Sequence, residues 1–347
     1  MKISGKTIGE KSEPFIIAEI SGNHDGSFLK MKKLIDAAKW SGADAVKLQT
    51  FKPELMTLNS NKKRFIVSHK NLKWSKKTLF SLFKKSYTPW EWYLPLQKYC
   101  KKKKIILFSS VFDLKSLEFL ESLNFPAYKI ASFENNDLNL IEQISKKKKP
   151  IIMSTGMASF NEIKNAFSSI KKELSEKNIA LLKCTSSYPA PFHDSNLRTI
   201  IDMKKKFKCE IGLSDHTIGT ISAVAAVTLG ATIIEKHICL NKKTGIDSFF
   251  SSTPEEMKKL VNETKLCFKS RGKIFYGTSK SEKNSIMNRR SLYTYKEIRK
   301  NEKFTWKNVI SLRPVIGIDS QFYKKVINKT STKNVSKNKA ITWDMIK

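Results

Sequence analysis

One pattern recurs eight times between Ile16 and Ile238: a short apolar run rich in β-branched residues, then a polar cluster, then a stretch with helical periodicity. The apolar runs lie at residues 16–20, 45–50, 105–110, 128–132, 151–155, 179–184, 211–215 and 232–238. Eight strands alternating with helices are typical of a (β/α)8 barrel, in which the C-terminal ends of all strands surround one mouth. We therefore expect an α/β fold of the TIM-barrel type.

The length of the chain leaves room for a second, smaller domain. Its 347 residues exceed the roughly 250 of a typical barrel. We expect a barrel domain over 1–270, opening with a short leader at 1–14, then a linker at 271–285 and a small domain at 286–347. The linker is rich in Gly, Lys, Ser and Asn and lacks apolar periodicity. The small domain has few residues for a core of its own, so we expect it to dock on something larger.

An insertion follows the second expected strand, over residues 52–92. It carries Trp74, Trp90 and Trp92. We expect this segment to form a lid over the mouth of the barrel.

Composition is typical of a cytoplasmic enzyme. Hydrophobic residues make up 40% of the chain, enough for a full core. No apolar run approaches the roughly 20 residues of a membrane span, and the first residues lack the apolar stretch of a signal peptide. The five scattered cysteines show no CxxC spacing, which argues against disulfides and cysteine-based zinc sites.

Net charge points in another direction. The 65 Lys and Arg residues against 31 Asp and Glu give +34, which raises the possibility of a nucleic-acid partner. The surplus is mostly lysine, in runs such as 101–104 and 146–149 that end helices and have no interleaved aromatic residues. We expect a solvated basic surface and no specific nucleic-acid site. A role in attracting anionic substrates or binding polyanions stays open.

Two histidines close adjacent strands. His216 follows the seventh expected strand and His237 follows the eighth, so both imidazoles should lie over one mouth. Two neutral imidazoles with nearby carboxylates suit a divalent metal that keeps positions free for water and a substrate oxygen. Alternatively, each histidine is a hydrogen-bonded structural residue. His24, on the first strand-to-helix loop, is a possible third group at the rim.

The strand ends also carry lysines and hydroxyl groups. Lys47 and Lys129 supply two positive charges, and Ser132, Ser154 and Ser214 supply donors. This set is suited to holding a small anion with phosphate and carboxylate groups, without a Gly-rich phosphate loop. Exposure of these side chains to solvent is the alternative.

Three carboxylates at the rim are candidate general bases: Glu19, Glu134 and Glu235. A carboxylate near a bound cation can take a proton from water. Ion pairs with the same lysines are the alternative role.

Seven ordered motifs resemble the sialic acid synthase family, and the resemblance covers nearly the whole chain. They are IAEISGNH at 17–24, DAVKLQT at 44–50, YKIASFE at 128–134, IMSTGM at 152–157, LKCTSSYP at 182–189, GLSDHT at 212–217 and IEKH at 234–237. Within the family, three segments resemble the pseudaminic acid synthase branch: YTPWEW at 87–92, ASFE at 131–134 and RSLY at 290–293.

The resemblance implies a reaction. Family members condense phosphoenolpyruvate with the open-chain aldehyde of an N-acylated amino sugar and release phosphate with C–O cleavage. They use Mn2+ or a similar metal, with Mg2+ and Co2+ as alternatives. The pseudaminic acid branch acts on a 2,4-diacetamido-2,4,6-trideoxy hexose and makes a nine-carbon nonulosonic acid.

Matching positions receive roles from the resemblance. The metal ligands would be His216 and His237, the base would be Glu134, and Glu19 would support the sugar or the water around the metal. The expected phosphoenolpyruvate ligands are Lys47, Lys129, Ser132, Ser154, Ser186 and Ser214. The residues expected to face the sugar are Gln49, Tyr188 and Asp247.

The C-terminal segment resembles the family's antifreeze-like (SAF) domain. The matching segments are EIRKNEKFT at 297–305 and SLRP at 311–314. In the family this domain caps the barrel of the partner subunit and contributes an arginine to the sugar's N-acyl group. Arg313 matches that arginine, so the resemblance implies a homodimer with swapped C-terminal domains. An ordinary surface arginine is the alternative.

Two departures from the family pattern bear on the substrate. Lys242 stands where relatives often have Arg, after a segment that has lost an Asp, and Ser186 stands where N-acetylneuraminate synthases have Asn. A lysine replaces a fork-shaped guanidinium poorly. Two alternatives to the pseudaminic acid assignment therefore stay open: the same chemistry on an N-acetylneuraminate or legionaminate precursor, and a non-catalytic barrel that binds polyanions.

Overall fold

The computed structural model describes residues 1–69, 71 and 73–347. They form two compact units, Met1–Gly272 and Lys273–Lys347. Within the described residues, no helix is long and apolar enough to cross a membrane.

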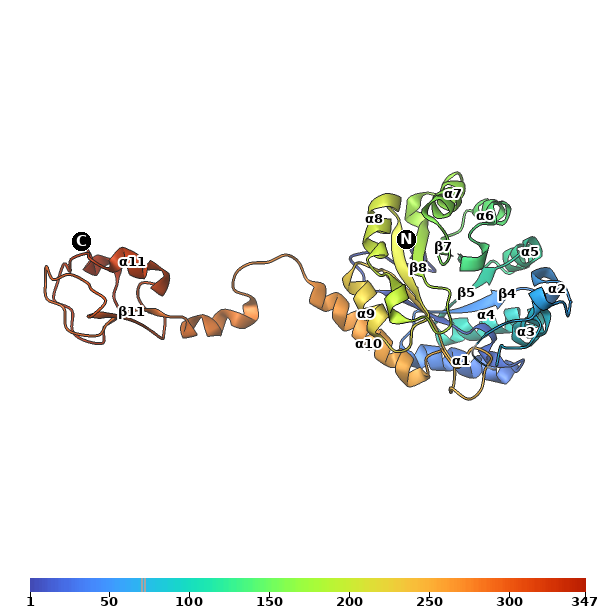
Figure 1. Cartoon of the computed structure of the whole chain (residues 1–347), viewed down its shortest axis with the longest axis horizontal. Helices are drawn as coiled ribbons and strands as arrows, with labels where there is room; N and C mark the ends of the chain where they lie inside the picture. The colour runs from blue at the N-terminus through green and yellow to red at the C-terminus, as the bar shows by residue number, and fades with distance from the viewer. Residues whose placement is uncertain (70, 72) are drawn as a thin grey trace. The chain divides into compact units, whose positions relative to one another are not determined.

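The first unit contains the expected closed barrel of eight parallel strands (Figure 1). The strands are β3 (Phe15–Glu19), β4 (Ala45–Thr50), β5 (Ile106–Val111), β6 (Tyr128–Ile130), β7 (Ile151–Ser154), β8 (Ile179–Cys184), β9 (Glu210–Asp215) and β10 (Ile233–His237). The pairing of β10 with β3 closes the ring. The fold prediction is confirmed, and all eight strands overlap the expected runs.

Helices surround the barrel, as Figure 1 shows. They are α1 (Phe28–Ser41), α4 (Tyr93–Lys103), α5 (Leu114–Ser122), α6 (Leu138–Ser145), α7 (Phe160–Lys171), α8 (Thr199–Phe207), α9 (Ile221–Thr228) and α10 (Pro254–Arg271). Side chains of Ser27, Asp113, Asp137, Ser159 and Thr253 cap five of the N-termini by accepting backbone N–H groups. The strands are buried almost throughout because helices cover one side and barrel-filling side chains the other.

The N-terminal segment is not a plain leader. It forms a hairpin of β1 (Lys2–Ile3) and β2 (Lys6–Thr7). Ile3 and Ile8 are buried in the main core, and the Met1 ammonium lies 4.0 Å from Glu210 Oε1, at the start of β9. The hairpin therefore packs at the N-terminal end of the barrel, away from the mouth.

The insertion between β4 and α4 contains α2 (Pro53–Met56), η2 (Lys63–Phe65), α3 (Leu79–Ser86) and η3 (Trp90–Trp92). The sequence predicts that this insertion forms a lid over the mouth, and its tryptophans pack at two different places. Trp90 stacks on Phe119 of α5 with ring centroids 4.3 Å apart, and Trp92 packs edge-on to Phe28 of α1. Those two rings anchor the insertion to the outer helices. Trp74 instead packs 5.4 Å from Tyr188, on the loop after β8.

The second unit has a small core of its own. Its elements are η7 (Lys280–Asn288), β11 (Ser291–Thr294), β12 (Val309–Leu312), η8 (Ser320–Phe322), α11 (Tyr323–Val326) and η9 (Trp343–Met345). The strands β11 and β12 pair antiparallel. The core residues are Leu292, Ile298, Phe304, Val309, Ile318, Val326 and Ile341. Part of the expected linker is helical, because η7 begins at Lys280.

Candidate active site

The C-terminal ends of the strands bring a buried ion-paired cluster together at the barrel mouth. Lys47 Nζ on β4 lies 2.7 Å from Glu19 Oε2 on β3 and 3.4 Å from Glu235 Oε1 on β10. It also donates to Ser110 Oγ at 3.0 Å, and Ser214 Oγ donates to Glu235 Oε1 at 3.2 Å. Both carboxylates and the ammonium are buried, so none of the three charges is screened by bulk water.

The two carboxylates of this cluster differ in their readiness to ionise. Burial raises the pKa of Glu19 to about 7, although Lys47 pulls it down. Burial also opposes the charge on Glu235, but Lys47 and Lys129 outweigh it and lower the pKa of that carboxyl. Glu235 is therefore the carboxylate that stays ionised, while Glu19 titrates near neutrality.

Lys129 on β6 supplies a second buried ammonium. Its Nζ donates to Ser154 Oγ on β7 at 2.6 Å and to the Ile130 carbonyl at 2.8 Å. Burial lowers the pKa of Lys129 to about 8, and Glu235 partly restores it. Burial destabilises the protonated form of Lys129. A bound anion would stabilise that form, because it replaces the hydration that the ammonium has lost.

Three hydroxyl-bearing or small residues crowd together beside Lys129. Gly156 N–H donates to Ser132 Oγ at 3.1 Å. A Cβ added at Gly156 would lie 2.7 Å from that same Oγ and would also press on Ser186 Oγ. Ser132, Gly156 and Ser186 therefore form one tight surface that leaves no room for a side chain at residue 156.

Glu134 ends a short 3-10 helix, η4 (Ser132–Glu134), directly after β6. Burial raises its pKa to about 7, against a downward pull from Lys129. Its Oε2 is buried with no hydrogen-bond partner among the described residues. Asn135 Nδ2 donates to the Gly156 carbonyl at 3.1 Å and so ties this turn to the loop after β7. The arrangement provides a desolvated carboxyl that exchanges a proton near neutral pH.

The rings of His216 and His237 lie side by side with centroids 5.5 Å apart. His216 Nδ1 lies 2.9 Å from the Thr185 carbonyl, which holds the proton on that nitrogen and leaves Nε2 as the acceptor. Burial and the neighbouring His216 hold the pKa of His237 well below its ordinary value, and its Nδ1 is buried with no hydrogen-bond partner among the described residues. An unpartnered buried imidazole nitrogen is a fitting ligand for a divalent cation.

The protein itself would supply only part of a coordination shell. Across residues 1–69, 71 and 73–347 there is no group of three or more His, Cys, Asp or Glu side chains arranged to hold a metal. His24 does not join the pair: its Nδ1 accepts from Gly26 N–H at 3.1 Å, and its ring meets Trp92 at 5.5 Å. His24 is therefore not part of a three-ligand metal group among the described residues. The residues present fit a metal with two protein ligands and open positions.

Cys184, at the end of β8, is a neighbour of the pair that received no role from the sequence. Its Sγ lies 3.9 Å from His216 Nδ1. Burial opposes ionisation of the thiol, but His216 outweighs it and lowers the pKa of Cys184 to about 7. No local motif indicated this contact, because it joins the ends of two strands.

Two strand-end lysines face away from the mouth. Lys236 alternates with the inward Glu235 and His237, and its Nζ donates to Asp215 Oδ2 and to the Thr217 carbonyl, both at 2.6 Å. Lys183 Nζ donates to the Cys184 carbonyl at 2.9 Å. Both lysines brace the barrel wall, as the side-chain alternation of strands requires.

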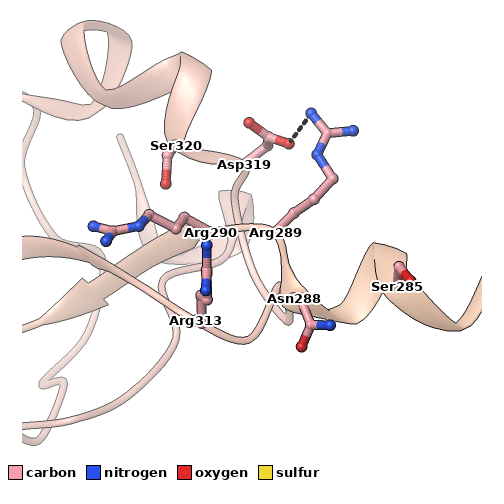
Figure 2. Close-up of a pocket in the computed structure, with 7 residues that line it drawn as sticks. All are labelled: Ser285, Asn288, Arg289, Arg290, Arg313, Asp319 and Ser320. Atoms are coloured by element: carbon pink, nitrogen blue, oxygen red, sulfur yellow. Dashed lines mark ion pairs between the residues drawn. The ribbon is translucent and has the colours of Figure 1, made fainter. Parts of the chain in front are cut away.

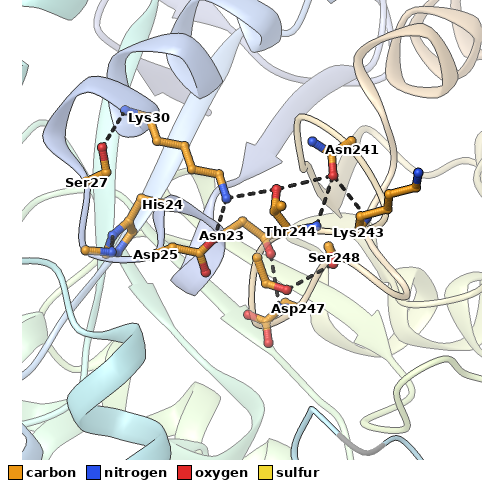
Figure 3. Close-up of polar contacts among 12 residues, drawn as sticks. Asn23, His24, Asp25, Ser27, Lys30, Asn241, Lys243, Thr244, Asp247 and Ser248 are labelled. Atoms are coloured by element: carbon orange, nitrogen blue, oxygen red, sulfur yellow. Dashed lines mark hydrogen bonds and ion pairs between the residues drawn. The ribbon is translucent and has the colours of Figure 1, made fainter.

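The expected sugar-facing residues lie near the histidines to different degrees. The Tyr188 ring is 4.4 Å from His216. Asp247, in the loop before α10, is buried and accepts from Ser21 Oγ at 2.5 Å. Its backbone N–H donates to Asn23 Oδ1 at 3.0 Å (Figure 3). Gln49 is half-buried at the end of β4. Phe250, which the sequence analysis missed, packs 4.8 Å from His237.

Lys242, the residue that departs from the family pattern, lies at the edge of the same loop. Its Nζ is 2.7 Å from Glu256 Oε2 in the first turn of α10 and donates to the Ser251 carbonyl at 2.5 Å. This lysine therefore ties the loop to α10.

In the second unit, Arg313 lines an open hollow (Figure 2). The hollow is lined by Ser285, Asn288, Arg289, Arg290, Arg313, Asp319 and Ser320. Arg289 pairs with Asp319 at 3.3 Å, and Arg290 donates to the Ser311 carbonyl at 3.1 Å. Arg313 is exposed, and among the described residues its guanidinium has no hydrogen bond or ion pair.

Comparison with known proteins identifies the family. The profile of the NeuB family matches residues 34–276. The chain belongs to the NeuB family. It is 42% identical to the pseudaminic acid synthase of Campylobacter jejuni over 325 residues, which are 92% of this chain and 93% of that protein. It is 40% identical to the pseudaminic acid synthase of Helicobacter pylori over 336 residues, 96% and 98% of the two chains.

A solved structure has a similar architecture. The N-acetylneuraminic acid synthetase of Leptospira borgpetersenii superposes with a TM-score of 0.73 at 32% identity, covering 82% of this chain and 94% of that one. The family resemblance inferred from the motifs is confirmed.

Proposed function

We propose that this protein is a pseudaminic acid synthase, which condenses phosphoenolpyruvate with a 2,4-diacetamido-2,4,6-trideoxy hexose and releases phosphate. The observation that carries the proposal is the convergence at one barrel mouth of the Lys47–Glu19–Glu235 cluster, Lys129 and the two histidine rings. Similarity to two pseudaminic acid synthases over more than nine-tenths of the chain supports this choice of substrate.

Phosphoenolpyruvate would bind across the two buried lysines. Its phosphate and carboxylate need positive charges and several hydrogen-bond donors. The interactions with these groups are stronger in a buried site that excludes water. The ligands in this proposal are Lys47, Lys129, Ser132, Ser154, Ser186 and Ser214. The lowered pKa of Lys129 supports it, because a bound anion would stabilise the protonated lysine.

His216 and His237 would hold the divalent metal, for which we propose Mn2+, with Mg2+ or Co2+ as alternatives. When bound there, such an ion supplies Lewis-acid polarisation of the sugar's aldehyde carbonyl. The chain's own contribution is to orient the His216 ring through the Thr185 carbonyl and to keep the His237 imidazole neutral through burial.

The proposed reaction forms one C–C bond and breaks one C–O bond. C3 of phosphoenolpyruvate attacks the aldehyde carbon, whose oxygen takes up a proton and becomes a hydroxyl. Water adds to the resulting oxocarbenium at C2 and gives its proton to Glu134. The C2–O bond to phosphate then breaks, and the phosphate leaves with the bridging oxygen and the proton of the new C2 hydroxyl, so that C2 becomes a ketone. The proton that Glu134 took from water balances the one that the aldehyde oxygen took up. The pKa of Glu134, about 7, suits a group that accepts and returns a proton within one turnover.

The remaining side of the mouth would receive the sugar. Glu19 would support the sugar or the water near the metal, and Gln49, Tyr188 and Asp247 would contact the sugar chain. The packing of Tyr188 on His216, and of Phe250 on His237, places apolar surface beside the proposed ligands. Such surface suits a sugar that carries acetyl groups and a 6-deoxy carbon.

We propose a homodimer in which the C-terminal antifreeze-like (SAF) unit of one subunit caps the barrel of the other, with Arg313 reaching the sugar's N-acyl group. Exposed apolar side chains support it, since they lie in the segments that follow β6, β7, β8 and β9, up to the first residue of α9: Phe133, Met157, Phe192, Ile218 and Ile221. The first residues of the second unit expose Ile274, Phe275 and Tyr276. Apolar surface on both parts suits burial between copies.

The cytoplasm is the proposed location. The five cysteines are free in the structure, which fits a reducing compartment.

Phosphate release with a panel of sugars tests the proposal. Protein, Mn2+ and phosphoenolpyruvate are incubated with the 2,4-diacetamido-trideoxy sugar, N-acetylmannosamine or the legionaminate precursor. Fastest turnover with the first sugar supports the proposal. Preference for either of the other two would show the same chemistry on another substrate, and no turnover with any would favour the polyanion-binding alternative that the +34 charge leaves open.

A further inference from the structure

Lys73, in the insertion, is held by the backbone of the loop that joins β10 to α10. Its Nζ donates to the Gly245 carbonyl at 3.1 Å, the Lys243 carbonyl at 3.2 Å and Ser248 Oγ at 2.5 Å. The Lys242 carbonyl lies 3.4 Å away. No carboxylate among the described residues pairs with this ammonium. Lys73 therefore occupies a ring of neutral oxygens, the type of environment that a bound monovalent cation takes.

The neighbouring Trp74 also binds this loop. Its Nε1–H donates to the Ile246 carbonyl at 3.1 Å. Its ring packs 5.4 Å from Tyr188 and 5.9 Å from Phe250. The two consecutive residues thus bind successive carbonyls of the loop and also touch the aromatic surface beside the histidines.

The loop needs such external support. Its exposed part, 241–244, is neither helix nor strand and carries two of the chain's surplus lysines. From the barrel side, Asn23 holds it by donating to the Ile238 carbonyl and to Ser251 Oγ, both at 2.9 Å, and by accepting from Asp247 N–H (Figure 3). Lys30 adds a 3.2 Å contact to Thr244. Lys73 and Trp74 hold the same loop from the insertion.

We propose that Lys73 and Trp74 are positioning residues that set the place of the loop 239–252, and so of Asp247 and Phe250, against the histidine pair. The kinetic part of this inference rests on the proposed function. Lys73 acts through the backbone of the loop and does not touch the substrate. Loss of its ammonium leaves the Lys243 carbonyl and Ser248 Oγ without their donor. The Gly245 and Lys242 carbonyls keep the hydrogen bonds from Ser248. The loop therefore moves, and the sugar side of the mouth loses its shape.

The first test needs no substrate. Hydrogen–deuterium exchange is compared for wild type, Lys73→Met and Lys76→Met, a nearby exposed lysine of the same insertion. Faster exchange of the 239–252 peptide in Lys73→Met alone, with the 233–237 strand unchanged, is the expected result. Equal exchange in all three proteins would overturn the positioning role, and faster exchange throughout the barrel would show a general structural role instead.

The second test separates the two substrates. For Lys73→Met we expect the KM for the sugar to rise about 10- to 100-fold, the scale of hydrogen bonds to a charged group, with the KM for phosphoenolpyruvate within about twofold of wild type. Trp74→Phe, which keeps the ring and loses the N–H, should give a smaller rise. Methylammonium should restore part of the sugar affinity in Lys73→Ala. Equal rises for both substrates, or no rise for the sugar, would contradict the proposal. Wild type that turns over none of the sugars would overturn the proposed function and leave the exchange result to decide the positioning role.

Discussion

The His216 and His237 rings lie 5.5 Å apart on adjacent strand ends, and the Thr185 carbonyl fixes the tautomer of His216. Excess chelator should abolish turnover and Mn2+ should restore it. His216→Ala and His237→Ala should each lose activity and Mn2+ binding, measured by calorimetry, while circular dichroism shows a folded protein. His193→Ala, which removes an exposed imidazole, is the matched control. Full activity of either ring mutant in chelator would rule out the metal.

Glu134→Gln tests the base. The variant should bind phosphoenolpyruvate as well as wild type and lose about 10²- to 10⁴-fold in kcat, the usual range for a general base. Its matched control is Glu255→Gln, on the exposed side of the first turn of α10. A rate equal to wild type would move the role to Glu19 or to solvent.

The pH profile should depend on the same residue. Burial raises the pKa of Glu134 to about 7, against Lys129, and a base acts only when deprotonated. The wild-type rate should therefore rise with pH through about 7, and this rise should be absent in Glu134→Gln. Glu19 titrates in the same range, so a rise that persists in the variant would assign it to Glu19.

Gly156→Ala tests the anion site. The added Cβ would press on Ser132 and Ser186, which are expected to hold phosphoenolpyruvate. We expect the KM for phosphoenolpyruvate to rise about 10-fold or more, since one or two hydrogen bonds to a charged ligand are displaced. Gly219→Ala, at a glycine with open space around it but a left-handed backbone, separates local strain from loss of the site. An unchanged KM in Gly156→Ala would place the anion elsewhere.

Arg313 tests the assembly. If it acts across a two-fold dimer, His216→Ala chains mixed with Arg313→Ala chains form heterodimers in which one site is whole. With random exchange, half the dimers are mixed, so roughly a quarter of wild-type activity should return. In a control mixture, His216→Ala chains are combined with Arg299→Ala chains. This mixture shows the activity expected when Arg313 is intact in every chain. Activity that stays at the parental level after verified exchange would place arginine and barrel within one chain.

Much of the fold was predictable because its signal is local. Each strand of a parallel barrel is a short β-branched run, and the two runs 45–50 and 179–184 match β4 and β8 in full. Strand β6 ends at Ile130, two residues before the end of the expected run 128–132, because Ser132–Glu134 form a 3-10 helix. The N-terminal hairpin was missed because strands of two residues carry no periodicity.

The site was predictable to the extent that strand ends must meet. Glu19, Lys47 and Lys129 were expected at one mouth, and the structure places all three there. Contacts between distant loops left no pattern in the sequence. The contact of Trp74 with Tyr188, that of Phe250 with His237 and that of His24 with Trp92 each join segments that are far apart in the sequence.

The substrate preference tests the central claim most directly. In competition, the protein with Mn2+ and phosphoenolpyruvate is given the 2,4-diacetamido-2,4,6-trideoxy hexose and N-acetylmannosamine, and kcat/KM is obtained for each from phosphate release and product mass. A higher kcat/KM for the trideoxy sugar, with a nine-carbon acid as the product, is the result that the proposed function predicts. A higher value for N-acetylmannosamine would contradict the pseudaminic acid assignment, and absence of phosphate release with both sugars would contradict the synthase reaction itself.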